Sequence, residues 1–170
     1  MNELHIQNKF LIPFFKDNVN GLGYREVEAN TITNNLIIEA DLKEFLSDTE
    51  LNEKNYQKLL KKSKHNEEKL MNEMTEFLIN RMKNYRNMAL FINDNKSFTF
   101  KGLKFYLFYP SGTEVYGDRL FDQNIFSVVQ ELPYKFEYNR KQIFSFRPDI
   151  SIFVNGIYLG YSELKSNYNN

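Results

Sequence analysis

The stretch from Ser145 to Ser166, SFRPDISIFVNGIYLGYSELKS, constrains the fold more than any other part of the chain. Two short apolar runs meet at Asn155-Gly156, a dipeptide typical of a tight β-hairpin turn. Asp149 precedes the first run, and Glu163-Leu164-Lys165 follows the second. The pattern therefore predicts two paired antiparallel strands that fold two carboxylates and a lysine back beside one another.

These three side chains have the chemistry of a site that cuts phosphodiesters. Ionised Asp149 and Glu163 could share a hard cation such as Mg²⁺, with water completing its shell. The metal would polarise a phosphoryl oxygen and lower the pKa of a bound water, and Lys165 would position that water or stabilise developing negative charge. The alternative is structural: a surface salt bridge from Lys165 to either acid, with Asp149 serving as a strand-start residue after Pro148.

The register of the predicted hairpin decides whether the two acids can meet. A regular two-residue turn at Asn155-Gly156 puts Asp149 and Glu163 on opposite faces. One additional residue, from a three-residue loop with a left-handed Gly156 or from a bulge at Gly160, places Glu163 diagonal to Asp149, with roughly 7–8 Å between their Cβ atoms. The metal-site hypothesis therefore predicts an irregularity at Gly156 or Gly160.

The acid-x-lysine triplet is not specific by itself. Three further copies lie in predicted helices or turns, and most of them are expected to be ordinary surface charges: Asp41-Leu42-Lys43, Glu67-Glu68-Lys69 and Asp94-Asn95-Lys96.

Composition limits the class of protein. The 170 residues, 42% of them hydrophobic, fit one domain with a real core. Equal numbers of basic and acidic residues, 22 each, argue against a module that coats nucleic acid, though not against a domain that receives its DNA from neighbours. The chain has no cysteine, and its two histidines, His5 and His65, lie far apart. The absence of cysteine and of an evident secretory signal together favour the cytoplasm. No apolar run is long enough to cross a membrane.

Periodicity predicts helices first and strands afterwards. We expect a helix over residues 3–18 with a break near Pro13, a second helix within 41–64 that Asp48 or Thr49 can cap, and a third over 67–91, with short strands at 24–28 and 36–38. Further strands are predicted over 97–100, 103–109, 124–132 and 136–146, and a polar, turn-like segment over 115–123. This order predicts an α+β domain with helices flanking one mostly antiparallel sheet. The lysine cluster at Lys58–Lys64 is interpreted as a solvated helix face rather than a nucleic-acid patch.

Three motifs separated by aliphatic runs give the chain a family resemblance: Arg147-Pro148-Asp149, Val154-Asn155-Gly156 and Glu163-Leu164-Lys165. In these motifs it resembles the N-terminal nuclease domain of the restriction (R) subunit of type I restriction-modification enzymes, within the PD-(D/E)xK nuclease superfamily. An upstream strand also matches, through Asn124, Phe126, Val128, Val129 and Gln130. The resemblance covers most of the chain, but only the part from Asn124 onward is specific.

The resemblance implies a restriction-endonuclease-like core with a site on the hairpin. Asp149 and Glu163 would bind Mg²⁺, and Lys165 would complete the catalytic set. The superfamily often adds an acid from the first helix. Glu3 is the nearest candidate, although Gln7 can occupy the equivalent place.

The function implied is a DNA endonuclease that hydrolyses double-stranded DNA without reading its sequence. A specificity subunit, together with the modification (methyltransferase) subunit, would choose the target, and cutting would follow ATP-driven translocation. No GxxxxGK[ST] phosphate loop occurs here, so ATP would bind only in motor domains outside this chain. The chain stops before the family's Gln-x-x-x-Tyr helix. Residues 1–170 are therefore expected to be a single nuclease domain excised from a longer R subunit, and whether it cuts alone is left open.

Two other functions use the same fold. One is a catalytically silent docking domain, which Mn²⁺ binding by the wild type and its loss in Asp149→Ala would argue against. The other is a repair or Holliday-junction nuclease of the same superfamily. The three site residues do not distinguish it from the leading hypothesis, and only the wider family match disfavours it.

Overall fold

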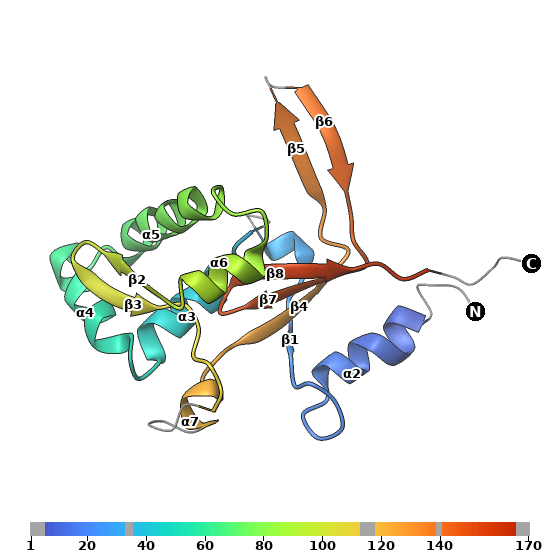
Figure 1. Cartoon of the computed structure of the whole chain (residues 1–170), viewed down its shortest axis with the longest axis horizontal. Helices are drawn as coiled ribbons and strands as arrows, with labels where there is room; N and C mark the ends of the chain where they lie inside the picture. The colour runs from blue at the N-terminus through green and yellow to red at the C-terminus, as the bar shows by residue number, and fades with distance from the viewer. Residues whose placement is uncertain (1–5, 33–35, 113–117, 139–140, 166–170) are drawn as a thin grey trace, which may run out of the picture.

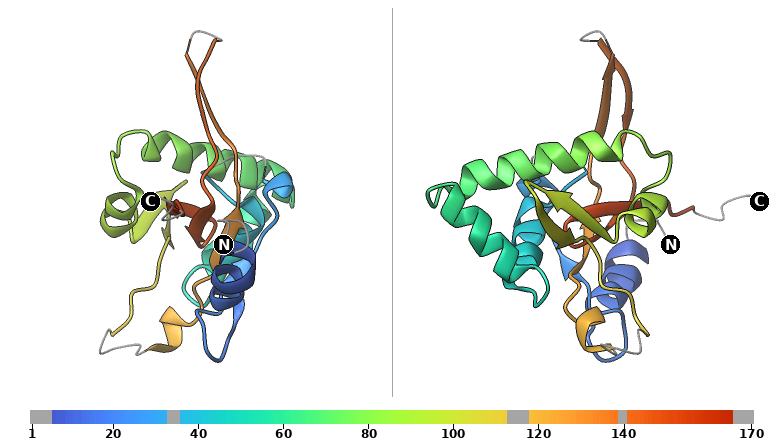
Figure 2. Two further views of the ribbon diagram at one scale, coloured as in Figure 1. Left: turned by 90° about the vertical axis from the view of Figure 1, so that its right-hand side faces the viewer. Right: turned by 60° about the vertical axis from the view of Figure 1, so that its left-hand side comes forward.

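The computed structural model describes residues 6–32, 36–112, 118–138 and 141–165. Helices and strands mix as the sequence predicts, and the strands pair mostly antiparallel, so the α+β prediction is confirmed. Figures 1 and 2 show the helices α3 (Glu39–Asp48), α4 (Glu53–Lys62) and α5 (Glu67–Met82) on one side of a central sheet. Within the described residues, no helix has the length and apolarity needed to cross a bilayer.

The central sheet has the order β1-β4-β7-β8. Its strands are β1 (Arg25–Glu26), β4 (Phe126–Gln130), β7 (Ile150–Val154) and β8 (Ile157–Ser162). Strand β1 is parallel to β4, and the other pairs are antiparallel. The strand predicted over 24–28 is thus confirmed as a two-residue strand, and the run at 36–38 contributes an isolated bridge, from Ile37 to Ile157.

Two side chains explain how so short a strand as β1 is held. Arg25 donates hydrogen bonds to Asp41 at 3.0 Å and to Glu44 at 2.8 and 3.0 Å, both on α3 (Glu39–Asp48). Asp41 is buried and also accepts a hydrogen bond from Ser127 Oγ on β4 at 2.6 Å. Asp41 was predicted to be an ordinary surface charge. That prediction is wrong, because this carboxylate joins β1, α3 and β4.

A second hairpin interrupts the connection from β4 to β7. It consists of β5 (Tyr134–Tyr138) and β6 (Lys141–Phe146), which pair only with each other. Figure 1 shows it projecting well beyond the body of the molecule. We call it the arm. It corresponds to the strand predicted over 136–146, which is wrong in extent because that run covers the end of one strand, β5, and the whole of the next, β6.

The N-terminal helix begins with a π-helical turn, η1 (Gln7–Leu11), and continues as α2 (Ile12–Lys16). The irregularity expected near Pro13 therefore takes the form of a change in hydrogen-bonding pattern, with the Ile12 N–H donating to the Gln7 carbonyl. Ile12 is buried and packs with Val128 of β4 and Ile150 of β7, which seats this helix against the sheet. A short 3₁₀ turn, η2 (Ala29–Thr31), follows β1.

The helix predicted to start from a cap at Asp48 or Thr49 is α4 (Glu53–Lys62), but its N-cap is Asn52, while Thr49 ends α3 and donates its hydroxyl to the Phe45 carbonyl. The long helix predicted over 67–91 is wrong in extent, because it is a pair of helices. The segment 67–91 forms α5 (Glu67–Met82) and α6 (Met88–Asp94). Asn87 starts α6 by accepting hydrogen bonds from the N–H groups of Ala89 and Leu90.

The strands predicted after Ser97 form the hairpin β2 (Ser97–Phe100) and β3 (Leu103–Tyr106), joined through left-handed Lys101 and Gly102. This hairpin is separate from the central sheet. The segment predicted to be turn-like, 115–123, includes a one-turn helix, α7 (Asp118–Phe121), while residues 115–117 lie outside the described residues.

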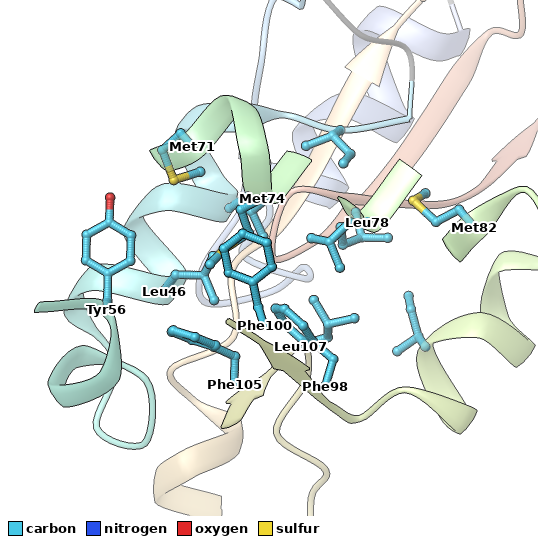
Figure 3. Packing of buried hydrophobic residues seen from close by; sticks show 14 of the residues in the cluster. Leu46, Tyr56, Met71, Met74, Leu78, Met82, Phe98, Phe100, Phe105 and Leu107 are labelled. Carbon is cyan, nitrogen blue, oxygen red and sulfur yellow. The ribbon is translucent and has the colours of Figure 1, made fainter. Parts of the chain in front are cut away.

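The main core lies between α5 and the β2–β3 hairpin. The apolar stripe of α5 is buried, including Met74 and Leu78, and it packs with Phe98, Phe100 and Phe105 of the hairpin (Figure 3). The methionines predicted to face a sheet are thus buried, although the hairpin supplies much of the opposing surface. The core continues to Val154 and Ile157, which flank the Asn155-Gly156 turn, so the turn is anchored in the interior.

Candidate functional site

The Asn155-Gly156 turn joins β7 to β8, and both of its residues have positive φ, 51° and 78°. Val154 pairs with Ile157, as a two-residue turn requires, so the predicted three-residue loop is not formed. A Cβ at Gly156 would lie 2.4 Å from the Ile38 carbonyl oxygen, which excludes any larger residue. Asn155 is buried and accepts a hydrogen bond from the Ile125 N–H at 2.7 Å. The turn is therefore a fixed reference for the register of both strands.

The predicted irregularity is present at Gly160. Next to the turn Phe153 pairs with Tyr158, but the following pair joins Ile152 to Gly160, so Leu159 is an extra residue on β8. This bulge is one of the two alternatives that the sequence left open, and it is confirmed. It shifts every later pair by one residue, and the ladder ends with Ile150 opposite Ser162.

The shifted register brings the two predicted acids to the same end of the hairpin. Asp149 directly precedes Ile150, and Glu163 directly follows Ser162, which is the last pair of the ladder. Continued by one position, the ladder would set Asp149 directly opposite Glu163, rather than diagonal to it as predicted. An in-register hairpin, which would have separated the acids across the sheet, does not form.

A hydrogen bond fixes this arrangement. The backbone N–H of Leu164 donates to Asp149 Oδ2 at 2.5 Å, which holds the carboxylate against the peptide unit that follows Glu163. Asp149 is half-buried, whereas Glu163 and Lys165 are exposed. Strand β8 ends at Ser162, so Glu163 and Lys165 lie just beyond the paired ladder.

Gln7 is the residue that the first helix contributes to this region. Its side chain is buried, and Nε2 donates hydrogen bonds to the Asp149 carbonyl oxygen and to Gln130 Oε1, each at 3.0 Å. Sequence reasoning placed either Glu3 or Gln7 here. Glu3 lies outside the described residues, while Gln7 occupies the position beside Asp149.

Sequence reasoning missed a polar chain that extends from Gln7. Gln130, at the end of β4, donates to Glu26 Oε1 at 2.8 Å, and Lys16 Nζ lies 2.5 Å from Glu26 Oε2. The hydrogen bond from Lys16 and that from Gln130 lower the pKa of Glu26. Only the identity of Gln130 in the upstream strand pointed toward this chain of contacts, since its members are far apart in sequence.

The donor set fits a hard cation only in part. Two carboxylates on adjacent strand ends can bind Mg²⁺ when water or backbone carbonyls complete the shell. Within the described part of the chain, no group of three or more His, Cys, Asp or Glu side chains could hold a metal. Of the predicted site residues, Asp149 and Glu163 are the two that would hold one, and the first helix contributes the amide of Gln7, on the Asp149 carbonyl, rather than a third acid.

Comparison with known proteins places the chain in a family. A family model described as the type I restriction enzyme R protein N terminus matches residues 1–170, so the chain belongs to this family. The mixed α+β architecture with its mostly antiparallel sheet is consistent with a restriction-endonuclease-like fold. The curated proteins and the solved structures gave no match to this chain.

Proposed function

We propose that this member of the type I restriction enzyme R protein N-terminal family is a metal-dependent DNA endonuclease domain. Asp149 and Glu163 would hold a divalent cation, Mg²⁺ by preference, and the bulge at Gly160 that aligns them is the observation that carries the proposal. The alternative is a docking domain without metal chemistry. In that case Glu163 and Lys165 would be ordinary exposed surface residues.

The residues of the chain have separate roles in this proposal. The Leu164 N–H orients the Asp149 carboxylate, and Gln7 holds the backbone of the same residue through its carbonyl. When bound, the cation would supply an activated water and polarise the phosphodiester. The ammonium group of Lys165 would stabilise the negative charge that develops on the phosphate oxygens.

The family also supports a setting for this activity. In a type I restriction complex, specificity and methyltransferase subunits would select the DNA, and ATP-driven motor domains would move it. We propose that residues 1–170 supply only the cleavage step, and that ATP has no site in them. Zero net charge suits a domain that receives double-stranded DNA from such neighbours.

Metal binding and DNA nicking together test the proposal. Titration calorimetry with Mn²⁺ should show binding by the wild type and loss of binding by Asp149→Ala. Asp94→Ala is the matched control, because Asp94 is an exposed acid in another acid-x-lysine triplet. The control should bind Mn²⁺ as the wild type does.

The second measurement is conversion of supercoiled plasmid to nicked circles in Mg²⁺, with Lys165→Ala added to the series. Lys165→Ala should bind metal but nick far more slowly, because its role is on the phosphate rather than the cation. A wild type that binds no Mn²⁺, or an Asp149→Ala variant that binds it equally well, would favour the docking alternative.

A further inference from the structure

We propose that the chain has a second site, a phosphate-binding pocket between the end of α4, the start of α5 and the β2–β3 turn. Phosphates of a DNA backbone are the ligand favoured by the setting, and free polyphosphate has the same chemistry. The pocket uses neither Asp149 nor Glu163, and the elements that line it lie on the side of the molecule opposite the end of β8 (Figure 1).

The pocket has a volume of about 330 Å³ and a basic rim formed from three separate elements. Lys62 and Lys64 come from the end of α4, Lys69 from the first turn of α5, and Lys101 from the β2–β3 turn. A single acid, Glu73, lines it with them. Four ammonium groups from three elements form a concave basic surface. A helix face that is merely solvated would not need lysines from other elements to gather around it.

The local charge is uneven although the whole chain is neutral. Residues 54–66 contain five lysines and no aspartate or glutamate. Two of the neighbouring acids already have cationic partners, since Glu73 pairs with Lys101 and Glu67 with Lys43. Among the described residues, the remaining rim lysines have no ion pair. The pocket therefore keeps uncompensated positive charge that a phosphate could neutralise.

Helix electrostatics explain only part of the cluster. Lys61 and Lys62 lie in the last turn of α4, where a cation favours the helix dipole. Lys69 lies in the first turn of α5, where the same dipole disfavours a cation. Glu73, one turn further along α5, attracts Lys69, and an anionic ligand would in addition offset the dipole and the repulsion from the lysines at the end of α4.

The experiment measures binding of a short DNA duplex by fluorescence anisotropy, with EDTA present so that no cleavage occurs. Lys62→Gln/Lys69→Gln is the test variant, because both residues are helical with ordinary backbone angles. Lys83→Gln/Lys96→Gln is the control, with the same change in net charge at exposed lysines outside the pocket. A circular dichroism spectrum establishes that each variant is folded.

We expect the test variant to bind more weakly and to lower the slope of log K against log salt by about 2, since each lost phosphate contact removes ~0.9. The control should keep the wild-type slope. A second arm titrates inorganic pyrophosphate by NMR. Saturable shifts at the Lys69 amide, with duplex binding equal in both variants, would assign the pocket to free phosphates. Equal duplex binding without such shifts would overturn the proposal. Because metal is absent, neither result depends on cleavage.

Discussion

The Leu164 N–H and the Asp149 carboxylate are joined by a 2.5 Å hydrogen bond that crosses from the end of β8 to the start of β7. The bond closes the open end of the hairpin after the last strand pair, Ile150 with Ser162. Asp149→Ala should lower the free energy of unfolding by about 1 kcal/mol through loss of this bond. Asp149→Asn keeps an acceptor and should lose less in urea denaturation, although both variants should fail to bind Mn²⁺. Equal stability of the alanine variant and the wild type would contradict this role of the bond.

Two single-residue deletions in β8 test the register. Deletion of Leu159 removes the bulge but keeps Ile152 opposite Gly160 and the pairs beyond, so Mn²⁺ binding should survive. Deletion of Ser162 moves Glu163 into the position opposite Ile150, on the other face from Asp149, so binding should be lost. Calorimetry on both folded variants checks the pair. Binding that survived both deletions would show that the alignment of the acids is not required.

Gln7 should be a positioning residue whose amide cannot be replaced. Gln7→Leu leaves the Asp149 carbonyl and Gln130 Oε1 without their donor, and should cost ~1–3 kcal/mol of stability. Gln7→Glu sets a buried carboxylate against two acceptor oxygens, which raises its folded pKa above the unfolded value. That variant should therefore lose stability as pH rises above about 4.3, whereas Gln7→Leu should show no such added dependence. Urea melts at several pH values separate the two.

Substitution by alanine should affect stability very differently at the two glycines of the β7–β8 hairpin. At Gly156, φ is +78° and a Cβ would meet backbone atoms of Ile38 and Leu42 at 2.4 and 2.6 Å. Gly156→Ala should therefore destabilise the fold by more than ~1–2 kcal/mol. At Gly160 no atom lies within 4 Å of a built Cβ, so Gly160→Ala should be close to neutral. Thermal melts measure both, and a neutral Gly156→Ala would contradict the buried turn.

The ion pair between Lys16 and Glu26 should make the stability of the fold sensitive to acid. The hydrogen bond from Lys16, followed by that from Gln130, lowers the folded pKa of Glu26. A lowered folded pKa gives stability that is present above the unfolded value of about 4.3 and is lost as pH falls. Lys16→Met should reduce this acid-side dependence, and added salt should reduce it in the wild type. Stability measured from neutral pH downward tests it, and an unchanged dependence in Lys16→Met would count against the pair.

The hairpin was the most predictable part of the fold because its information is local. Asn155-Gly156 marks the turn, and counting residues from it showed that Asp149 and Glu163 need one irregularity. Which irregularity occurs was not predictable, since a three-residue loop and a bulge at Gly160 satisfy the same count. The choice depends on Asn155 and Gly156 packing into the interior, which is a long-range effect.

The helix ends were less predictable, because the apolar stripe continues across the breaks. Tyr85 and Met88 keep helical spacing with α5, yet α5 ends at Met82. A separate helix, α6, begins at Met88 after its N-cap, Asn87. The asparagine is a local capping signal that the periodicity concealed. The contacts of Asp41 with Arg25 and Ser127 could not be predicted, since they join elements that only the tertiary fold brings together.

The arm is connected to Asp149 by a very short stretch of chain. Its second strand ends at Phe146, and only Arg147 and Pro148 separate that residue from Asp149. Its base is attached to β8 by edge-on ring contacts, Phe146 with Tyr161 and Tyr134 with Tyr158. A partner that displaced the arm would pull on both strands that present the acids. A displacement of the arm would therefore be transmitted to the candidate site.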